Sequence, residues 1–89
     1  MPELFSTCQF FEDGSYEYVR RRVDAVEAAR AAHFYTHNVA ARCGITQRVI
    51  VTDALDCICF EWKYGEGVVF PTKEMIEELK EEDNDKTAP

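Results

Sequence analysis

Two histidines and two cysteines have spacings that could build a metal site. His33 and His37 stand four residues apart, which places both rings on one face of a helix. Cys57 and Cys59 stand two residues apart, on one face of a strand. Four such side chains can bind zinc, although the sequence lacks both the HExxH motif and CxxC spacing. A zinc-binding or redox module that uses these four residues is therefore one alternative.

No set of residues has the spacing of a catalytic centre. Cys43 lies near the end of a predicted helix, where the helix dipole disfavours a thiolate. Asp53 and Asp56 flank a predicted turn, where aspartate commonly bonds to its own backbone. The Gly-Glu-Gly stretch at residues 65–67 is not followed by a helix that could direct amides toward a phosphate. We therefore expect a protein that is not an enzyme and has no cofactor.

Aromatic and arginine side chains mark a candidate interface in the first part of the chain. Strand alternation places one set on a face that we expect in the core: Leu4, Ser6, Cys8, Phe10, Val19 and Val23. The opposite face then carries Phe5, Phe11, Tyr16, Tyr18, Arg20 and Arg22. Aromatic residues and arginine are enriched in binding hot spots, and they also stack on unpaired bases. This second face predicts an interface with another protein or with a second copy of the chain. Binding of single-stranded RNA is one alternative. An ordinary packed or solvated surface is the other.

Carboxylates in the second half of the chain form a second candidate surface. Its members are Asp53, Asp56, Glu61, Glu66, Glu77 and Glu81. An acidic surface of this kind can occupy a basic groove on a partner, although a solvated helix face that aids solubility explains the same pattern.

The elements that position these residues begin with a hairpin. Residues 4–11 and 16–23 are rich in strand formers, and the Asp-Gly pair between them favours a tight turn. A two-residue turn predicts the pairs Phe11 with Tyr16, Gln9 with Tyr18, and Thr7 with Arg20.

A single long helix is expected over residues 25–42. Asp24 is a good N-cap, and Glu27 completes a capping-box pattern. The segment is dense in alanine, the strongest helix former, and Gly44 can end it.

The remaining segments read as strands and a short helix. Strands are expected at residues 47–52, 57–64 and 68–70, with Ile58, Phe60 and Trp62 facing the core. Thr72 can cap a final acidic helix whose apolar stripe is Met75, Ile76 and Leu79.

The element order ββαβββα predicts an α+β fold with two layers. An antiparallel sheet would carry the alanine-rich helix on one face, with the short acidic helix at the C-terminus. Residues 1–82 would form a single domain and residues 83–89 a flexible acidic tail.

Charge excludes some classes of partner. Ten Lys and Arg against seventeen Asp and Glu give the 89-residue chain a net charge of −7. Like charges repel, so we expect neither direct DNA binding nor docking on an acidic membrane. No apolar stretch approaches the roughly 20 residues of a membrane span, and the first residues lack the features of a signal peptide. We expect a cytoplasmic protein with reduced cysteines.

Two stretches within residues 38–71 resemble a known group of proteins. Residues 46–71 (TQRVIVTDALDCICFEWKYGEGVVFP) and residues 38–44 (NVAARCG) resemble small uncharacterised proteins of phages and prophages. Size and acidity are also similar to those of anti-CRISPR proteins. The resemblance implies a protein-binding inhibitor that occupies a surface of a larger protein or ribonucleoprotein complex in the host cell cytoplasm. It carries no residue roles.

Overall fold

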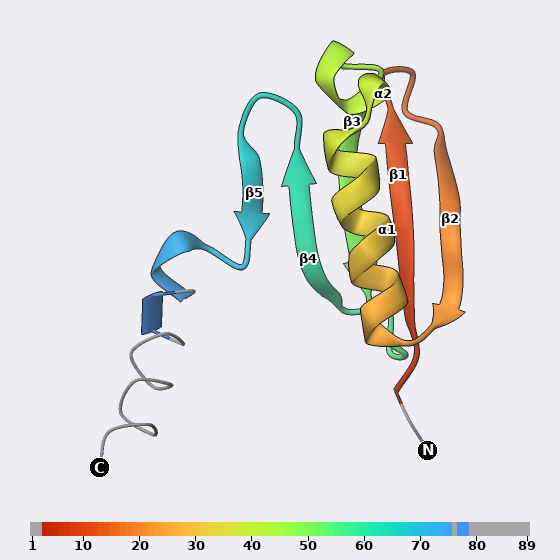
Figure 1. Ribbon diagram of the computed structural model, residues 1–89, viewed down its shortest axis with the longest axis vertical. Coiled ribbons are helices and arrows are strands. Elements are labelled where there is room, and N and C mark those ends of the chain that lie inside the picture. The colour runs from red at the N-terminus through yellow and green to blue at the C-terminus, as the bar shows by residue number, and fades with distance from the viewer. Residues whose placement is uncertain (1–2, 76, 79–89) are drawn as a thin grey trace.

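The computed structural model describes residues 3–75, 77 and 78. In this part of the chain, five strands form one antiparallel sheet in the order β2-β1-β3-β4-β5. The strands are β1 (Phe5–Phe11), β2 (Tyr16–Val23), β3 (Thr46–Thr52), β4 (Ile58–Lys63) and β5 (Gly67–Phe70). Two helices, α1 (Ala25–His37) and α2 (Val39–Cys43), connect β2 to β3, and α1 lies across β1 and β3 (Figure 1). The predicted α+β fold with a helix on one face of an antiparallel sheet is confirmed.

The alanine-rich segment forms two helices, so the prediction of one helix over residues 25–42 was wrong. Asp24 caps α1 as expected, since its carboxylate accepts the backbone N–H of Glu27 at 2.8 Å. Asn38 has an extended backbone that ends α1, and its side chain accepts the N–H of Ala41 at 2.9 Å to start α2. Asparagine competes with helical backbone bonding in this way, and alanine propensity does not overcome it. Gly44 ends α2 in the left-handed conformation, as predicted.

The core lies between α1 and the centre of the sheet. Ala28 and Ala32 of α1 pack on Val49 and Val51 of β3, and small side chains allow this close approach. Partly buried residues complete the cluster: Phe5, Val23, Tyr35, Phe60 and Trp62.

A β-bulge changes which residues of β4 face the core. Val51 pairs with Phe60 and the next residue, Thr52, pairs with Ile58, so Cys59 is the extra residue of the bulge. Phe60 therefore stays in the core as predicted, whereas Ile58 is 38% exposed, which corrects its predicted place.

The predicted faces of the first hairpin were wrong for β1, and a bulge changes the register of β2. Thr7 pairs with Arg20 as expected, but Tyr18 pairs with Cys8 and not with Gln9, and Tyr16 pairs with Phe10 and not with Phe11. The Thr7 hydroxyl donates to the carbonyl of Ala28 at 2.9 Å, which places Thr7 on the side of α1. Phe5 also packs in the core, although it was assigned to the outer face.

Residues with even numbers in β1 therefore lie on the face away from α1. This set includes Ser6, Cys8 and Phe10, which were expected on the core face. Cys8 is nevertheless buried, with 2% of its surface exposed, so its predicted burial is confirmed although it lies on the other face. The turn is longer than two residues, since Phe11 N–H donates to the Ser15 carbonyl and Gly14 N–H to the Phe11 carbonyl. Of the predicted core set, Val23 does pack against the cluster under α1.

The chain continues past β5 into a helical turn. Residues 73–75, 77 and 78 are helical, and the Thr72 hydroxyl accepts the N–H of Met75 at 3.2 Å, as the predicted cap requires. The predicted domain limit at residue 82 and the tail at residues 83–89 lie outside the described residues. With 13 residues, α1 is too short to cross a membrane, and none of the helices in the described ranges has the length and apolarity of a membrane span.

Candidate functional site

Aromatic and arginine side chains gather on the sheet face opposite to α1, at the β2 edge. We call this surface the aromatic face. Its members are Phe10, Tyr16, Tyr18, Arg21 and Arg48. Tyr16 and Tyr18 are 61% and 42% exposed, and their rings meet edge to face with centroids 6.0 Å apart. The surface therefore offers large apolar rings to solvent in a fixed arrangement.

Each end of the aromatic face carries a guanidinium group over a ring. The Cζ atom of Arg21 lies 4.7 Å from the centroid of the Tyr18 ring, and that of Arg48 lies 4.9 Å from the Phe10 ring. These distances are those of cation–π contacts, which orient both partners.

The arginine that lies beside the tyrosines is Arg21 and not the predicted Arg20. Arg20, the predicted member, pairs with Thr7 on the side of α1, and its Nε lies 3.8 Å from a carboxylate oxygen of Glu27. The bulge brings Arg21 to Tyr18 instead. Sequence alternation missed Arg21 because one extra residue in a strand reverses the side of the residues that follow. A further register shift before Val23 reverses the side again, so Val23 lies in the core as predicted. Arg48 had a detectable signal, since it alternates with the buried Val49 of β3.

The predicted acidic surface is divided in the structure. Asp53 and Asp56 lie in the β3–β4 turn and Glu66 in the β4–β5 turn, at opposite ends of β4 (Figure 1). Glu61 lies on β4 and accepts from Arg48 Nε at 2.6 Å, so an arginine neutralises it. Glu77 follows β5, and Glu81 lies outside the described residues. These carboxylates therefore do not form one patch in the described part of the chain.

Some members of the two predicted surfaces meet in a groove of about 430 Å³. This mixed-charge groove is lined by Tyr18, Arg21, Arg22, Asp53 and Asp56 among others. It continues the aromatic face toward the β3–β4 turn, and the strand order brings the two segments together. The groove offers a ligand both a cationic and an anionic group beside an aromatic ring.

Two residues of this groove have left-handed backbones. Arg22 has φ 55° and Asp56 has φ 61°. Aspartate tolerates this region, but an arginine there costs free energy, which the surrounding contacts must offset. The Arg22 N–H donates to the Ser6 hydroxyl at 3.1 Å.

Asp53 has a structural role in the turn. Its Oδ1 accepts the backbone N–H groups of Leu55 at 2.9 Å and Cys57 at 3.0 Å. This is the local bonding for which turns select aspartate. Asp56 is therefore the carboxylate of the mixed-charge groove with fewer internal bonds.

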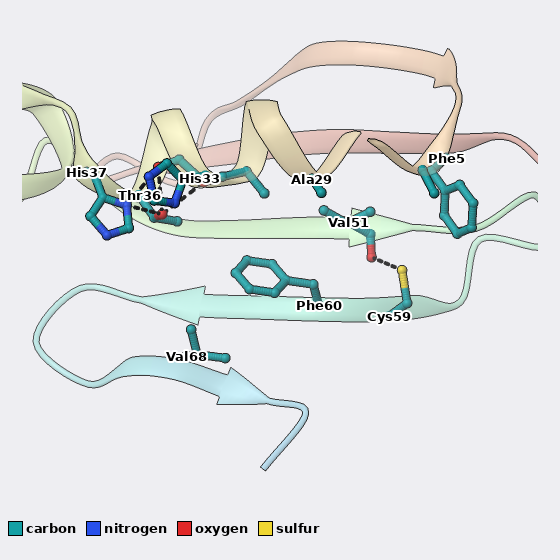
Figure 2. Close-up of a pocket in the computed structure, with 11 residues that line it drawn as sticks. Phe5, Ala29, His33, Thr36, His37, Val51, Cys59, Phe60 and Val68 are labelled. Atoms are coloured by element: carbon teal, nitrogen blue, oxygen red, sulfur yellow. Dashed lines mark hydrogen bonds between the residues drawn. The ribbon is translucent and has the colours of Figure 1, made fainter. Parts of the chain in front are cut away.

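The four predicted zinc ligands, all within the described residues, do not form one cluster. The His33 and His37 rings stack with centroids 4.3 Å apart, and His37 Nδ1 lies 2.8 Å from the His33 carbonyl. His33, His37 and Cys59 line a separate groove of about 350 Å³ along α1, with the histidines at one end and Cys59 at the other (Figure 2). The Cys59 thiol donates to the Val51 carbonyl at 3.3 Å. Cys57 does not line this groove. Within residues 3–75, 77 and 78, no three His, Cys, Asp or Glu side chains cluster as metal ligands would.

Burial also makes two thiols less reactive. It raises the pKa of Cys59, with the nearby Asp53 carboxylate as a smaller cause, and it raises the pKa of Cys8. A thiol with a raised pKa is mostly protonated near neutral pH and is a weak nucleophile. Neither group has the environment of an activated cysteine.

Comparison of the chain with family models, with curated proteins and with solved structures finds no match. The aromatic face and the mixed-charge groove therefore have to be interpreted from their own chemistry.

Proposed function

We propose that this chain is a non-enzymatic protein-binding domain that holds its partner through the aromatic face. The observation that carries the proposal is the exposed tyrosine pair. Tyr16 and Tyr18 are 61% and 42% exposed, yet they pack edge to face, and Arg21 lies over the Tyr18 ring. Tyrosine and arginine are the residue types that most often form interface hot spots.

The arrangement lowers the cost of binding. A tyrosine has few rotatable bonds, and rings that already contact one another lose little conformational freedom when a partner covers them. The phenol groups keep a polar end that can donate to or accept from the partner. A protein surface with an apolar centre therefore fits the rings.

The charged groups around the aromatic face indicate which charges the edge of the partner's surface should carry. Arg48 is neutralised by Glu61, but Arg21 and Arg22 line the mixed-charge groove next to Tyr18. A partner placed over this groove would meet these two guanidinium groups and also the carboxylates of Asp53 and Asp56, so a partner edge that carries both signs of charge fits it. The whole chain has a net charge of −7, which opposes nucleic acid as the partner.

In its finer form the proposal is a phage-type inhibitor similar to anti-CRISPR proteins. It would occupy a surface of a larger protein or ribonucleoprotein complex in the cytoplasm of a host cell. Support for this form comes from the resemblance of residues 46–71 and from the size and acidity of the chain.

The experiment is an affinity capture with three versions of the tagged full chain. They are the wild type, Tyr16→Ala with Tyr18→Ala, and Phe34→Ala. Phe34 is the matched control because it is an aromatic side chain of α1, 59% exposed and outside the aromatic face. We expect a protein partner that co-elutes with the wild type and the control and is lost with the tyrosine variant.

Each other outcome contradicts the proposal. Equal recovery with all three versions would place binding elsewhere on the surface. Recovery of nuclease-sensitive nucleic acid, with an affinity that falls steeply with salt, would favour the single-stranded RNA reading. A tyrosine-dependent dimer with no other protein would make the aromatic face a contact between two copies of the chain.

A further inference from the structure

The groove along α1 lies on the other side of the sheet from the aromatic face, and we call it the apolar groove. Its volume is about 350 Å³, which is within the range of sites that hold small molecules. Aliphatic and aromatic side chains make up most of its lining, among them Ala25, Ala29, Ala32, Val51, Phe60 and Val68 (Figure 2). Ala29 and Val68 are exposed, so apolar surface faces solvent along this groove.

The apolar groove follows from the way in which one helix covers the sheet. Within the described residues, α1 packs on β1, β2 and β3, while β4 and β5 extend to one side of it (Figure 1). The residues of α1 beside this uncovered part of the sheet include three that are small, Ala25, Ala29 and Ala32. Alanine side chains occupy little volume, so α1 and β4 enclose a hollow between them.

The polar side chains of the apolar groove lie together at one end. His33, Thr36 and His37 line the end near the C-terminus of α1, whereas Cys59 lies at the far end (Figure 2). The Cys59 thiol already donates to the Val51 carbonyl at 3.3 Å. A ligand in the groove therefore meets apolar surface along most of its length and polar groups at one end.

The groove also lacks side chains that carry a full charge. Among the described residues, no Asp, Glu, Lys or Arg lines it. A charged group that leaves water without a partner of opposite charge is strongly disfavoured, whereas a neutral polar group needs only a hydrogen bond. A neutral ligand with one polar end therefore fits this lining better than an ion.

Hydrogen bonds determine which nitrogen of His37 carries the proton. Nδ1 of His37 lies 2.8 Å from the His33 carbonyl oxygen and 3.0 Å from the Thr36 hydroxyl oxygen. Because a carbonyl can only accept, Nδ1 is the donor. The Thr36 hydroxyl donates to the Ala32 carbonyl at 2.8 Å, so its oxygen can accept from the same N–H. In a neutral imidazole the second nitrogen, Nε2, is then an acceptor, and it points away from α1 (Figure 2).

We propose that the apolar groove binds a small apolar molecule with a hydroxyl group at one end, an aliphatic alcohol in its simplest form. The carbon chain lies over Ala29, Val51 and Phe60, where it buries apolar surface. The hydroxyl donates to Nε2 of His37, the acceptor that the Nδ1–H bond leaves open. The tyrosines are on the opposite face of the sheet, so this site is independent of the proposed function.

Methyl NMR of the full chain tests the site with n-octanol as the probe. We expect n-octanol to shift the methyl resonances of Ala29, Val51 and Val68 and to reach saturation. The methyl groups of Leu55 are the internal control, because Leu55 is 82% exposed and lies outside the groove. Groove resonances that do not move, or that move without saturation together with those of Leu55, would overturn the proposal.

A matched pair of variants on α1 tests whether the groove itself is occupied. Ala29→Phe places a ring in the groove, whereas Val26→Phe places one on an exposed position of the same helix outside the lining. We expect the affinity for n-octanol to fall by about tenfold or more in Ala29→Phe and to stay unchanged in Val26→Phe. Circular dichroism checks that both variants are folded. Equal affinity in the two variants would place the alcohol elsewhere.

The polar end of the ligand is tested with heptyl methyl ether, an isomer of n-octanol that cannot donate a hydrogen bond. We expect the ether to bind about fivefold more weakly than n-octanol, which corresponds to the loss of one hydrogen bond. His37→Phe keeps a ring but removes the acceptor, so it should bind the two isomers equally. The ¹⁵N resonance of His37 Nε2 should move with n-octanol and not with the ether. Equal affinity of the wild type for both isomers would contradict the role of His37.

A second copy of the chain is the other occupant that these measurements detect. In that case the methyl resonances of the groove would change with protein concentration when no alcohol is present, and sedimentation would show a dimer that Ala29→Phe disrupts. This outcome would overturn the proposed ligand. It would leave the proposed function untouched, because the variants of that function lie on the aromatic face.

Discussion

The rings of Tyr16 and Tyr18 meet at 87° with centroids 6.0 Å apart, two positions apart on the edge strand of the sheet. Residues two apart in a strand share a face, so the pair is a direct product of strand geometry. Phe10 of β1 adds a third ring, 5.7 Å from Tyr16. Rings of this size on an exposed sheet face add little to the stability of the free domain.

Loss of the two tyrosine rings should separate binding from folding. For Tyr16→Ala with Tyr18→Ala we expect partner affinity to fall by about 30-fold or more, as for a hot spot of about 2 kcal/mol. The free energy of unfolding should fall by only about 1 kcal/mol, because cross-strand pairs on an exposed face contribute little. Titration calorimetry and urea denaturation measure the two effects. A large loss of stability with unchanged affinity would make the pair a packing element.

Breaking the pair of Arg48 with Glu61 should destabilise the domain. The two side chains are only 33% and 16% exposed, so Arg48→Ala leaves a carboxylate in a partly desolvated site. We expect a loss of about 1–3 kcal/mol in the free energy of unfolding. Adding Glu61→Leu should recover much of this loss, since it removes the unpaired charge. Urea denaturation of the single and double variants checks both values. A double variant as unstable as Arg48→Ala would show that the unpaired carboxylate does not cause the loss of stability.

Asn38 should contribute its cap to stability. Asn38→Ala removes the acceptor for the Ala41 N–H at the start of α2, and we expect a loss of about 1 kcal/mol. Asn38→Asp keeps an oxygen at the same position and should cost much less. Thermal unfolding followed by circular dichroism measures the difference. If both variants unfold at the same temperature, the Asn38 side chain does not stabilise the domain as a helix cap.

Backbone strain at Arg22 predicts an unusual response to glycine. Its φ of 55° is accessible to glycine without a steric penalty, so Arg22→Gly should leave stability unchanged or raise it by up to about 1 kcal/mol. Arg22→Val should lower it by about 1–2 kcal/mol, because a β-branched residue is disfavoured at positive φ. Chemical denaturation of both variants tests the order, and a glycine variant less stable than the valine variant would contradict it.

The Cys59 thiol of β4 should need a higher pH for alkylation than an ordinary cysteine thiol. Desolvation raises the pKa of Cys59, so a smaller fraction is thiolate at any given pH than for an ordinary cysteine. In Cys57→Ser, the alkylation rate of Cys59 should therefore rise at higher pH than that of a short cysteine peptide. The peptide, alkylated under the same conditions, supplies the reference profile. Mass spectrometry of the labelled protein gives both profiles. Coincident profiles would show that burial does not control the Cys59 thiol.

Much of the fold follows from short-range rules in the sequence. Asp24 starts a helix and Gly44 ends one because each acts on the backbone within a few residues. Tyr16 and Tyr18 share a face because strands alternate, and this part of the candidate site was predictable. Asn38 carried the signal for the break between α1 and α2, since its type is a common cap, but its alanine neighbours favoured a continuous helix.

The sequence by itself therefore determined the order of the five strands along the chain, the α+β fold and the shared face of the tyrosine pair. Only the tertiary structure decided which face of β1 is the core, because both faces carry apolar and polar residues. It also decided that Arg21 rather than Arg20 accompanies Tyr18, since a bulge adds one residue and reverses the side of those that follow. The strand order also brought Asp56 and Tyr18 to the lining of one groove, although no local rule connects their two segments.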